Sequence, residues 1–260
     1  MRISPMQGTY LEHLTWAEAE RSLYKFPVVL LPVGARLKEH GLHLPLNNDW
    51  LLAEYFTRRV LDEFPALALP TIQYGYYPAF TEYPGSIHIA RETFQATVSD
   101  ICRSLAKHGG KRFYVLNTGI STNWALEPAR LALADETITM EYTDLRTMLD
   151  DVVETIREQE AGTHADEIET SIMLFIHPEV VQMERARRDI DLRRRSGGLT
   201  RDKDAETGVY SPTGVWGDPT LATAEKGEIV VDAVVSRIVA FLHEFADDDY
   251  QPTDARKEYL

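Results

Sequence analysis

A run of six apolar residues, Val28 to Val33, constrains the fold of this chain more than any other stretch. The run is short and rich in branched side chains, which is typical of a strand buried on both faces of a parallel sheet. Gly34 ends the run, so the next loop leaves the carboxyl end of the strand. Ligands and catalytic groups gather at that edge of an open α/β sheet. We therefore expect a central parallel strand with functional residues in the loop after it.

The loop after this strand concentrates side chains that can bind a metal. Within twelve residues it carries Lys38, Glu39, His40, His43 and Asp49. Two imidazoles and two carboxylates this close together can converge on Zn, Mn or Fe, whose sites mix nitrogen and oxygen ligands. A His beside an acid in a loop is more often a cap or a surface pair. Asp49 in particular could be the amino-terminal cap of the following helix.

Length and composition limit the classes of protein to which the chain can belong. A chain of 260 residues, 44% of them hydrophobic, can bury a full core in one domain. The net charge of -14 argues against nucleic acid, because phosphate contacts need a basic face. The amino-terminal stretch does not resemble a signal peptide, and no run reaches the roughly 18 apolar residues of a membrane span. We expect a cytoplasmic protein that binds neither nucleic acid nor membrane.

Helices and strands alternate along the rest of the chain. Further strands are predicted at Ala66 to Ile72, Arg112 to Leu116 and Ile138 to Tyr142. Helices are predicted from Thr15 to about Tyr24, after Asp49, from Thr93 to His108, from Asp144 to about Glu160, after His164 and from Glu228 to Phe245. The first of them opens with a capping box, Thr15 to Glu18. This alternation predicts a single α/β domain over residues 1–260 with a mainly parallel sheet.

Three segments fall outside this alternation. The aromatic loop after the second strand contains Tyr76 and Tyr83, which could wall a small-molecule site or pack on a neighbouring subunit. The segment at about 184–210 is a basic arm or loop in an acidic chain, and either contacts a partner or is simply solvated. Residues from about 247 to 260 form a polar carboxyl-terminal tail.

The loop from Pro32 to Asp49, P-V-G-A-x-x-K-E-H-G-x-H-L-P-L-x-x-D, resembles the signature of the creatininase family of binuclear metal amidohydrolases. In that family a glutamate, a histidine and an aspartate of this loop ligate the metals. His40 and Asp49 keep the family's spacing, whereas Lys38 stands at the usual glutamate position with Glu39 beside it. The resemblance implies that Glu39, His40 and Asp49 are the metal ligands.

Two later motifs also resemble this family. His164-Ala165 and Glu169-Thr170-Ser171 resemble its H-A-G-x-x-E-T-S element, whose histidine transfers protons, so the resemblance implies catalytic roles for His164 and Glu169. An imidazole titrates near neutral pH, which suits moving a proton from water to a leaving amine. The resemblance also covers Tyr83 to Ser86 and Gly214 to Pro219. We assign the substrate site to His43, Tyr76, Tyr83, Ser121, Thr122 and Trp216.

One element departs from the family. The family's N-G-H-x-x-N loop supplies a histidine and a glutamate to the metals, and Ile120 and Thr122 stand at those positions here. An isoleucine cannot ligate a metal, and a neutral threonine hydroxyl is a poor replacement for a carboxylate. We therefore expect one divalent ion, Zn, Mn or Fe, rather than two.

The resemblance implies a three-layer α/β/α fold with a mainly parallel central sheet and a homo-oligomer, commonly a hexamer. It implies a metal-dependent amidohydrolase that acts on a small cyclic or linear amide through a metal-activated water. The alternative is a metal-free, catalytically inactive protein that binds a ligand or has a structural role on the same fold, because fold does not fix function.

Overall fold

A five-stranded parallel sheet forms the centre of the computed structural model, which describes residues 6–193 and 197–260. The strands are β1 (Thr9–Tyr10), β2 (Val28–Val33), β3 (Ala66–Ala68), β4 (Arg112–Asn117) and β5 (Thr139–Tyr142). Their order in the sheet is β1-β3-β2-β4-β5, and every pairing is parallel. All six residues of β2 are buried, which confirms the central strand expected at Val28 to Val33.

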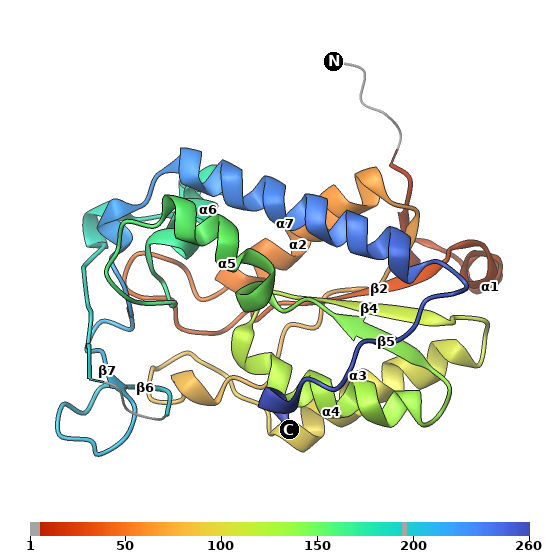
Figure 1. The fold of residues 1–260 in the computed structure, drawn as a ribbon, viewed down its shortest axis with the longest axis horizontal. Coiled ribbons are helices and arrows are strands. Elements are labelled where there is room, and N and C mark those ends of the chain that lie inside the picture. Colours follow the sequence, from red (N-terminus) through yellow and green to blue (C-terminus); the bar gives the residue numbers. More distant parts are fainter. Residues whose placement is uncertain (1–5, 194–196) are drawn as a thin grey trace.

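Helices cover both faces of this sheet. One layer consists of α2 (Asn48–Glu63), α5 (Leu145–Ile156), α6 (Glu167–Ile176) and α7 (Ala224–Phe245), and the other of α3 (Arg91–Ala106) and α4 (Asn123–Ala134) (Figure 1). A hydrophobic core lies between the sheet and each helical layer. Alternate residues of β2 pack into these two cores, because successive side chains of a strand point to opposite faces. Val28 and Leu30 join the α7 side, and Val29 and Leu31 the α3 side. The expected three-layer α/β/α fold is confirmed.

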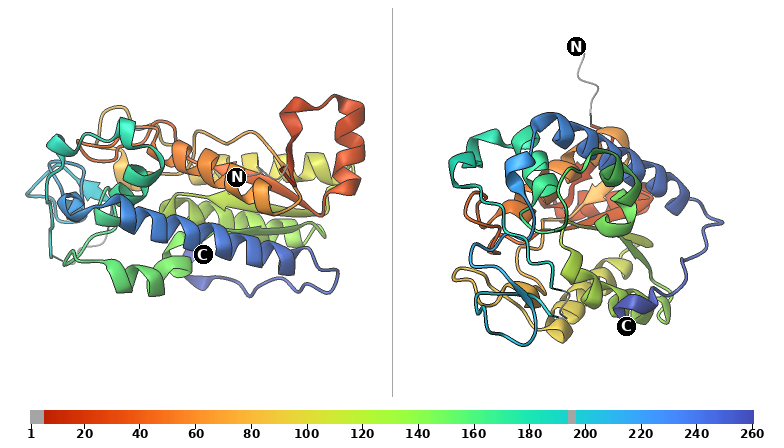
Figure 2. Two further views of the ribbon diagram at one scale, coloured as in Figure 1. Left: turned by 90° about the horizontal axis from the view of Figure 1, so that it is seen from above. Right: turned by 60° about the vertical axis from the view of Figure 1, so that its left-hand side comes forward.

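The helix α1 (Trp16–Lys25) projects from the body at one end (left view of Figure 2). The predicted capping box is present, since Glu18 Oε2 accepts from both the Thr15 backbone N and the Thr15 hydroxyl. Short 3-10 helices complete the secondary structure: Leu11–His13, Pro78–Phe80, Ile120–Thr122, Pro178–Val180, Met183–Arg185, Pro219–Leu221 and Lys257–Tyr259. Within the described residues, no helix has the length and apolarity that crossing a membrane requires.

Several element boundaries differ from the sequence prediction. The strand expected to run to Ile72 ends at Ala68, shortly before Pro70, which has no backbone N–H for the ladder. The helix expected to reach Glu160 ends at Ile156, although Asp144 does cap it by accepting from Arg146 N. The last helix begins four residues before Glu228, at Ala224, because Thr223 caps it there.

The possibility that Asp49 caps the helix after the loop that follows β2 is wrong. The helix α2 begins at Asn48, so Asp49 lies inside its first turn. Its carboxylate instead contacts Lys38 and His40. Asp49 is therefore a buried member of the loop cluster.

The segment at about 184–210 contains a second small sheet. Its strands β6 (Leu199–Thr200) and β7 (Val209–Tyr210) pair in parallel. Leu199 and Val209 are buried against Phe80 and the aromatic loop, so this part of the segment packs on the body. It lies at the same end of the molecule as the loops after β2 and β4, and this end comes forward in the right view of Figure 2.

The carboxyl-terminal tail folds back along α4 and β5. Tyr259 is fully buried, and its hydroxyl donates to Asp144 Oδ2 over 2.6 Å. Arg130 donates to the backbone oxygens of Thr253 and Asp254. The polar tail is therefore anchored by specific hydrogen bonds over much of its length.

Candidate active site

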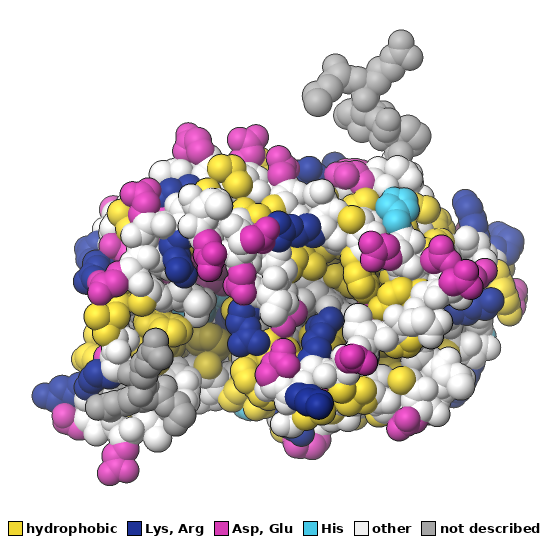
Figure 3. Space-filling view, in the orientation of Figure 1, with side chains coloured by type: hydrophobic (Ala, Val, Ile, Leu, Met, Phe, Trp, Pro, Cys, Tyr) yellow, Lys and Arg dark blue, Asp and Glu magenta, His cyan; other side chains and the backbone are white. Residues whose placement is uncertain are grey.

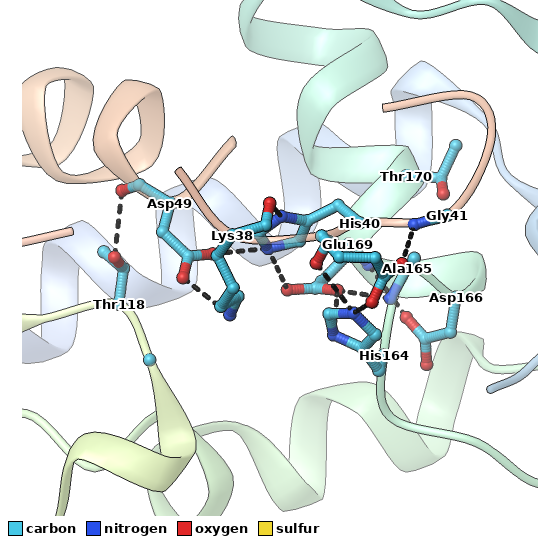
Figure 4. A network of polar contacts seen from close by, with 12 residues as sticks. Lys38, His40, Gly41, Asp49, Thr118, His164, Ala165, Asp166, Glu169 and Thr170 are labelled. Carbon is cyan, nitrogen blue, oxygen red and sulfur yellow. Dashed lines mark hydrogen bonds and ion pairs between the residues drawn. The ribbon is translucent and has the colours of Figure 1, made fainter. Parts of the chain in front are cut away.

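His40 is the centre of the loop cluster after β2. The side chain is completely buried, and Nδ1 lies 3.0 Å from the backbone oxygen of Lys38. This contact places a proton on Nδ1, so Nε2 is the nitrogen that can bind a metal. Nε2 lies 2.7 Å from Asp49 Oδ1 and 4.0 Å from Glu169 Oε1 (Figure 4). Gly41 adopts a φ of 71°, which lets the loop turn immediately after the imidazole.

Asp49 is held by two neighbours from the same loop. Its Oδ2 lies 2.6 Å from Lys38 Nζ, and its Oδ1 contacts His40. Burial alone would raise the pKa of Asp49, but the Lys38 ammonium and the His40 imidazole hold it well below its usual range. The Asp49 carboxylate is therefore charged, although it is fully buried.

His164 reaches the cluster from the loop before α6. Its Nε2 lies 3.1 Å from both Glu39 Oε2 and the Glu39 backbone oxygen, and its Nδ1 lies 3.6 Å from Glu169 Oε2. Burial alone would lower the pKa of His164, but the Glu39 and Glu169 carboxylates raise it above the ordinary value. Burial would likewise raise the pKa of Glu39, and His164 is the main reason that it is lowered instead. The two groups therefore stabilise each other's charged forms.

The backbone around His164 is fixed from two directions. His164 and Trp216 form an antiparallel bridge, with Trp216 N donating to the His164 backbone oxygen over 2.9 Å. Ala165 adopts a φ of 47°, a left-handed conformation that L-residues rarely adopt. Its N–H donates to Glu169 Oε2 over 2.5 Å. Strain of this kind is often found at functional sites, where the surrounding structure maintains it.

Asp166 caps α6 beside this histidine. Its Oδ1 accepts from the backbone N–H groups of Ile168 and Glu169, both over 3.0 Å. Burial and the nearby Glu169 carboxylate raise the pKa of Asp166 to about 6. The cap fixes the first turn of α6 and so sets the position from which Glu169 reaches His40 and His164.

The residues around His40 fit one metal ion. His40, His164 and Glu169 each offer a ligand atom, and these atoms lie within 4.8 Å of one another. Donor atoms bound to a common ion at about 2.1 Å are themselves roughly 3 to 4 Å apart. Asp49 Oδ1 and Glu169 Oε1 approach His40 Nε2 at about this spacing. Because Nδ1 of His40 is occupied by a backbone carbonyl, Nε2 is the nitrogen that can ligate.

The three predicted metal ligands, Glu39, His40 and Asp49, do not all contact one another. His40 and Asp49 are in direct contact, whereas Glu39 contacts His164 and the backbone N of Gly41. Glu169, which was assigned to catalysis, approaches His40 as well as His164. Ligation by Glu39, His40 and Asp49 and catalysis by His164 and Glu169 stay predictions.

A cavity of about 430 Å³ opens beside this cluster. Lys38, His164 and Glu169 line its polar end, and apolar residues of α5 and α6 line its walls: Leu145, Leu149, Val153, Ile168 and Ile172. Figure 3 shows a hollow with yellow hydrophobic side chains on this face of the molecule. The cavity therefore joins an apolar pocket to the charged groups around His40.

Two of the predicted substrate-binding residues, Ser121 and Trp216, line this cavity. The other four predicted substrate-binding residues are not among the described residues that line the cavity. His43 Nε2 contacts Thr170 Oγ1 at 2.8 Å, the Tyr83 hydroxyl donates to the Ser211 backbone oxygen over 2.7 Å, Tyr76 packs on His88, and Thr122 is fully buried. Their roles in substrate binding stay predictions. Burial also lowers the pKa of His43 to about 4, so this imidazole is neutral near pH 7.

Sequence reasoning missed two parts of the site. It noted Lys38 only as a departure from the usual glutamate and did not predict its ion pair with Asp49. It also predicted the helix from Asp144 to about Glu160 without assigning any of its residues to the site, whereas Leu145, Leu149 and Val153 line the cavity. The spacing of these three residues, i, i+4 and i+8, marks one face of a helix and could have identified the wall.

Comparison with known proteins identifies the family of this chain. The family model for creatininase, described as creatinine amidohydrolase, matches residues 12–242. Creatinine amidohydrolase of Pseudomonas putida is 27% identical and aligns with 95% of this chain and 99% of its own length. The mycofactocin precursor peptide peptidase of Mycobacterium ulcerans is 30% identical over 82% of this chain and 85% of its own.

Solved creatininase structures are similar to this chain in both fold and sequence. A creatininase structure with manganese superposes with a TM-score of 0.78 at 26% identity, covering 91% of this chain and 98% of its own. Another creatininase of the same fold is described as of the Zn-Zn type. The match extends through the loop after β2, the amino end of α6 and most of α7. By the family model that matches residues 12–242, by its relatives and by its three-layer α/β/α fold, this chain belongs to the creatininase family.

Proposed function

We propose that this protein is a metal-dependent hydrolase that cleaves the C–N bond of a small amide and uses one divalent ion, Zn, Mn or Fe, bound at His40. The observation that carries the proposal is the convergence of His40, His164 and Glu169 at the polar end of a cavity. The names of the relatives, an amidohydrolase and a peptidase, both denote cleavage of an amide bond. Solved creatininases with manganese or zinc support the choice of metal.

Of the ligands predicted from the sequence, we retain His40, through Nε2, and Asp49. We replace Glu39, which contacts His164, by Glu169, which approaches His40. A divalent ion held there supplies a Lewis acid that lowers the pKa of water toward ~7 and polarises a carbonyl oxygen. The carbonyl of Lys38 orients His40, and the cap at Asp166 orients Glu169. Such outer contacts fix the tautomer and direction of ligand side chains.

His164 is the proposed group for proton transfer. A histidine that ligates a metal must be neutral, whereas Glu39 and Glu169 favour the protonated form of His164. Its Nε2 is occupied by Glu39, and its Nδ1 faces the Glu169 side of the cavity. The protonated His164 can therefore donate the Nδ1 proton to the leaving nitrogen, and the neutral imidazole that results can take up a proton from an attacking water before the next turnover.

The cavity supports a small-molecule substrate with an apolar part. Its volume falls within the roughly 300 to 1,000 Å³ of sites for small ligands. Aliphatic side chains of α5 and α6 would contact the apolar part, while the amide would lie near Lys38 and His164. These walls do not favour creatinine over other cyclic or linear amides.

Metal analysis combined with a hydrolysis assay tests the proposal. Protein expressed with added zinc or manganese should retain about one equivalent after dialysis and hydrolyse members of a panel of cyclic and linear amides. His40→Ala should lose both properties. His177→Ala is the matched control, because His177 lies half-exposed at the far end of α6 and contacts Glu179.

The second candidate function is a metal-free protein that binds a ligand in the same cavity. The observation that favours it is the Lys38–Asp49 ion pair, which neutralises one carboxylate without any metal. Less than a tenth of an equivalent of metal, with no hydrolysis of any amide in the panel, would support this candidate over the hydrolase.

A further inference from the structure

The Lys38 side chain is a buried cation inside the candidate metal site. Its side chain is 5% exposed, and its Nζ lies 2.6 Å from Asp49 Oδ2. The same ammonium lies 4.8 Å from the ring centroid of Phe80 and 5.7 Å from that of Tyr77, within the range of cation–π attraction. The Lys38 backbone is also fixed, since its N donates to the Leu46 oxygen over 3.0 Å.

We propose that the Lys38 ammonium is a built-in positive charge that takes the place of a second metal ion beside Asp49. The proposal adds to the proposed function the reason why the site holds only one ion. It does not depend on catalysis, because the ammonium neutralises Asp49 whether or not a metal binds at His40.

The loop after β4 faces the same carboxylate without adding metal ligands. A Cβ atom placed on Gly119 would lie 3.8 Å from Asp49 Oδ2 and 2.9 Å from Thr122 Oγ1, so this loop passes beside the ion pair. The Thr118 hydroxyl donates to the backbone oxygen of Asp49 over 2.9 Å. The side chains of Ile120, Ser121 and Thr122, which follow on this loop, offer no imidazole or carboxylate. The donors near Asp49 Oδ2 therefore do not fit a second ion.

The balance of charge gives the same result. Three buried or half-buried carboxylates, Glu39, Asp49 and Glu169, surround His40. One divalent ion and one ammonium already supply three positive charges against these three negative charges, before any proton on an imidazole is counted. A second divalent ion beside Lys38 would leave an excess of positive charge, and unbalanced charge is costly in a buried site. Lys38 and one ion are therefore the combination that this set of side chains favours.

Metal stoichiometry in a matched pair of variants tests the exclusion of the second ion. Ile120→His adds an imidazole to the cavity that Lys38 lines and leaves the ammonium in place. Lys38→Glu/Ile120→His also exchanges the ammonium for a carboxylate, which gives an ion beside Asp49 three protein ligands. After dialysis against zinc, we expect about one equivalent in the wild type and in Ile120→His and about two in the double variant. Two equivalents in the wild type or in Ile120→His, or one in all three proteins, would overturn the proposal.

Stability without metal provides a second measurement that does not depend on these variants binding zinc. In a chelator, Lys38→Met should lower the Tm by about 6 to 15 °C, because it leaves a buried carboxylate unpaired. Asp49→Asn should lower it as well, and Lys38→Met/Asp49→Asn should melt above the value expected from the sum of the two effects. Additive effects, or an unchanged Tm in Lys38→Met, would show that the ammonium does not neutralise Asp49.

These measurements separate this proposal from the proposed function. A wild type that binds no metal would contradict the metal-dependent hydrolase, and the chelator experiment would still decide the role of Lys38. A wild type that binds two ions and hydrolyses amides would support the hydrolase and overturn the role of Lys38.

Discussion

The imidazole rings of His40 and His164 lie with their centroids 5.1 Å apart and their planes tilted by 40°. His40 follows β2 and His164 precedes α6, so two distant parts of the chain meet at one end of the sheet. Glu169 approaches both rings, at 4.0 Å from His40 Nε2 and 3.6 Å from His164 Nδ1. This arrangement allows one imidazole to bind a metal while the other transfers a proton.

The first prediction concerns His40. His40→Ala should remove most of the bound metal, because Nε2 of His40 is the nitrogen around which the carboxylates of Asp49 and Glu169 converge. Loss of one ligand or its support typically weakens metal binding by roughly 10-fold to 100-fold or more. Equilibrium dialysis against zinc, followed by elemental analysis, measures the change. Unchanged stoichiometry and affinity in a folded His40→Ala protein would contradict the assignment.

The sequence predicted most of the fold because the fold depends on local patterns. The unbroken apolar run at Val28 to Val33 predicts a strand covered on both faces, and two helical layers indeed cover it. The capping box at Thr15 and Glu18 marks a helix start from side chains three residues apart. The strand at Ala66 was predicted to be too long because an apolar run does not by itself show where pairing with a neighbour ends.

The site was harder to predict because its contacts join side chains whose directions depend on tertiary packing. Asp49 has the right chemistry for a helix cap, a metal ligand or a partner of Lys38, and only the folded loop shows that it contacts Lys38 and His40. Glu39 was predicted to be a metal ligand because of its place in the motif. In the structure it contacts His164, which lies on a loop far away in the sequence. Spacing identified these residues as members of one site without identifying which of them pair.

The second prediction concerns the carboxyl-terminal tail and pH. Glu127 accepts from Arg130 and from the backbone N of Arg256, so it connects α4 to the tail. Burial alone would raise the pKa of Glu127, but these donors lower it below the ordinary value. The tail contact is therefore fully present above about pH 4.3, the usual value for glutamate, and is lost as the pH falls through the lower folded pKa.

Thermal melts from pH 7 to pH 3.5 test this dependence. Glu127→Gln should lower the Tm at pH 7 by about 3 to 10 °C and should lose less further stability on acidification than the wild type does. The ring of Trp124 packs on Tyr259 at 5.1 Å, so tryptophan fluorescence reports whether the tail is released. Glu154→Gln, on the exposed face of α5, is the control. An acid transition of the same size in the wild type and Glu127→Gln would count against this role.

The third prediction concerns the apolar wall of the cavity. Val153→Trp should fill part of the space beside His164 and lower kcat/KM by roughly 10-fold or more, because the larger side chain hinders the substrate. Metal content should not change, since Val153 lies on α5 and is not one of the proposed ligands. Glu154→Trp places the same side chain on the exposed face of this helix and should leave the kinetics unchanged. Equal kinetics in the two variants would show that the substrate binds elsewhere.

The last prediction concerns His164, for which ligation and proton transfer give different results. Its position between Glu39 and Glu169 favours the protonated imidazole, which suits proton transfer and opposes ligation. His164→Ala should therefore keep about one equivalent of metal and lower turnover by about 10² to 10⁴, the usual contribution of a positioned acid or base. A histidine with only a structural role would instead reduce the Tm and leave the activity of the folded fraction unchanged. Metal content, Tm and rate are measured on one preparation: a stable, metal-loaded and fully active variant would refute the catalytic role, and a variant without metal would make His164 a ligand.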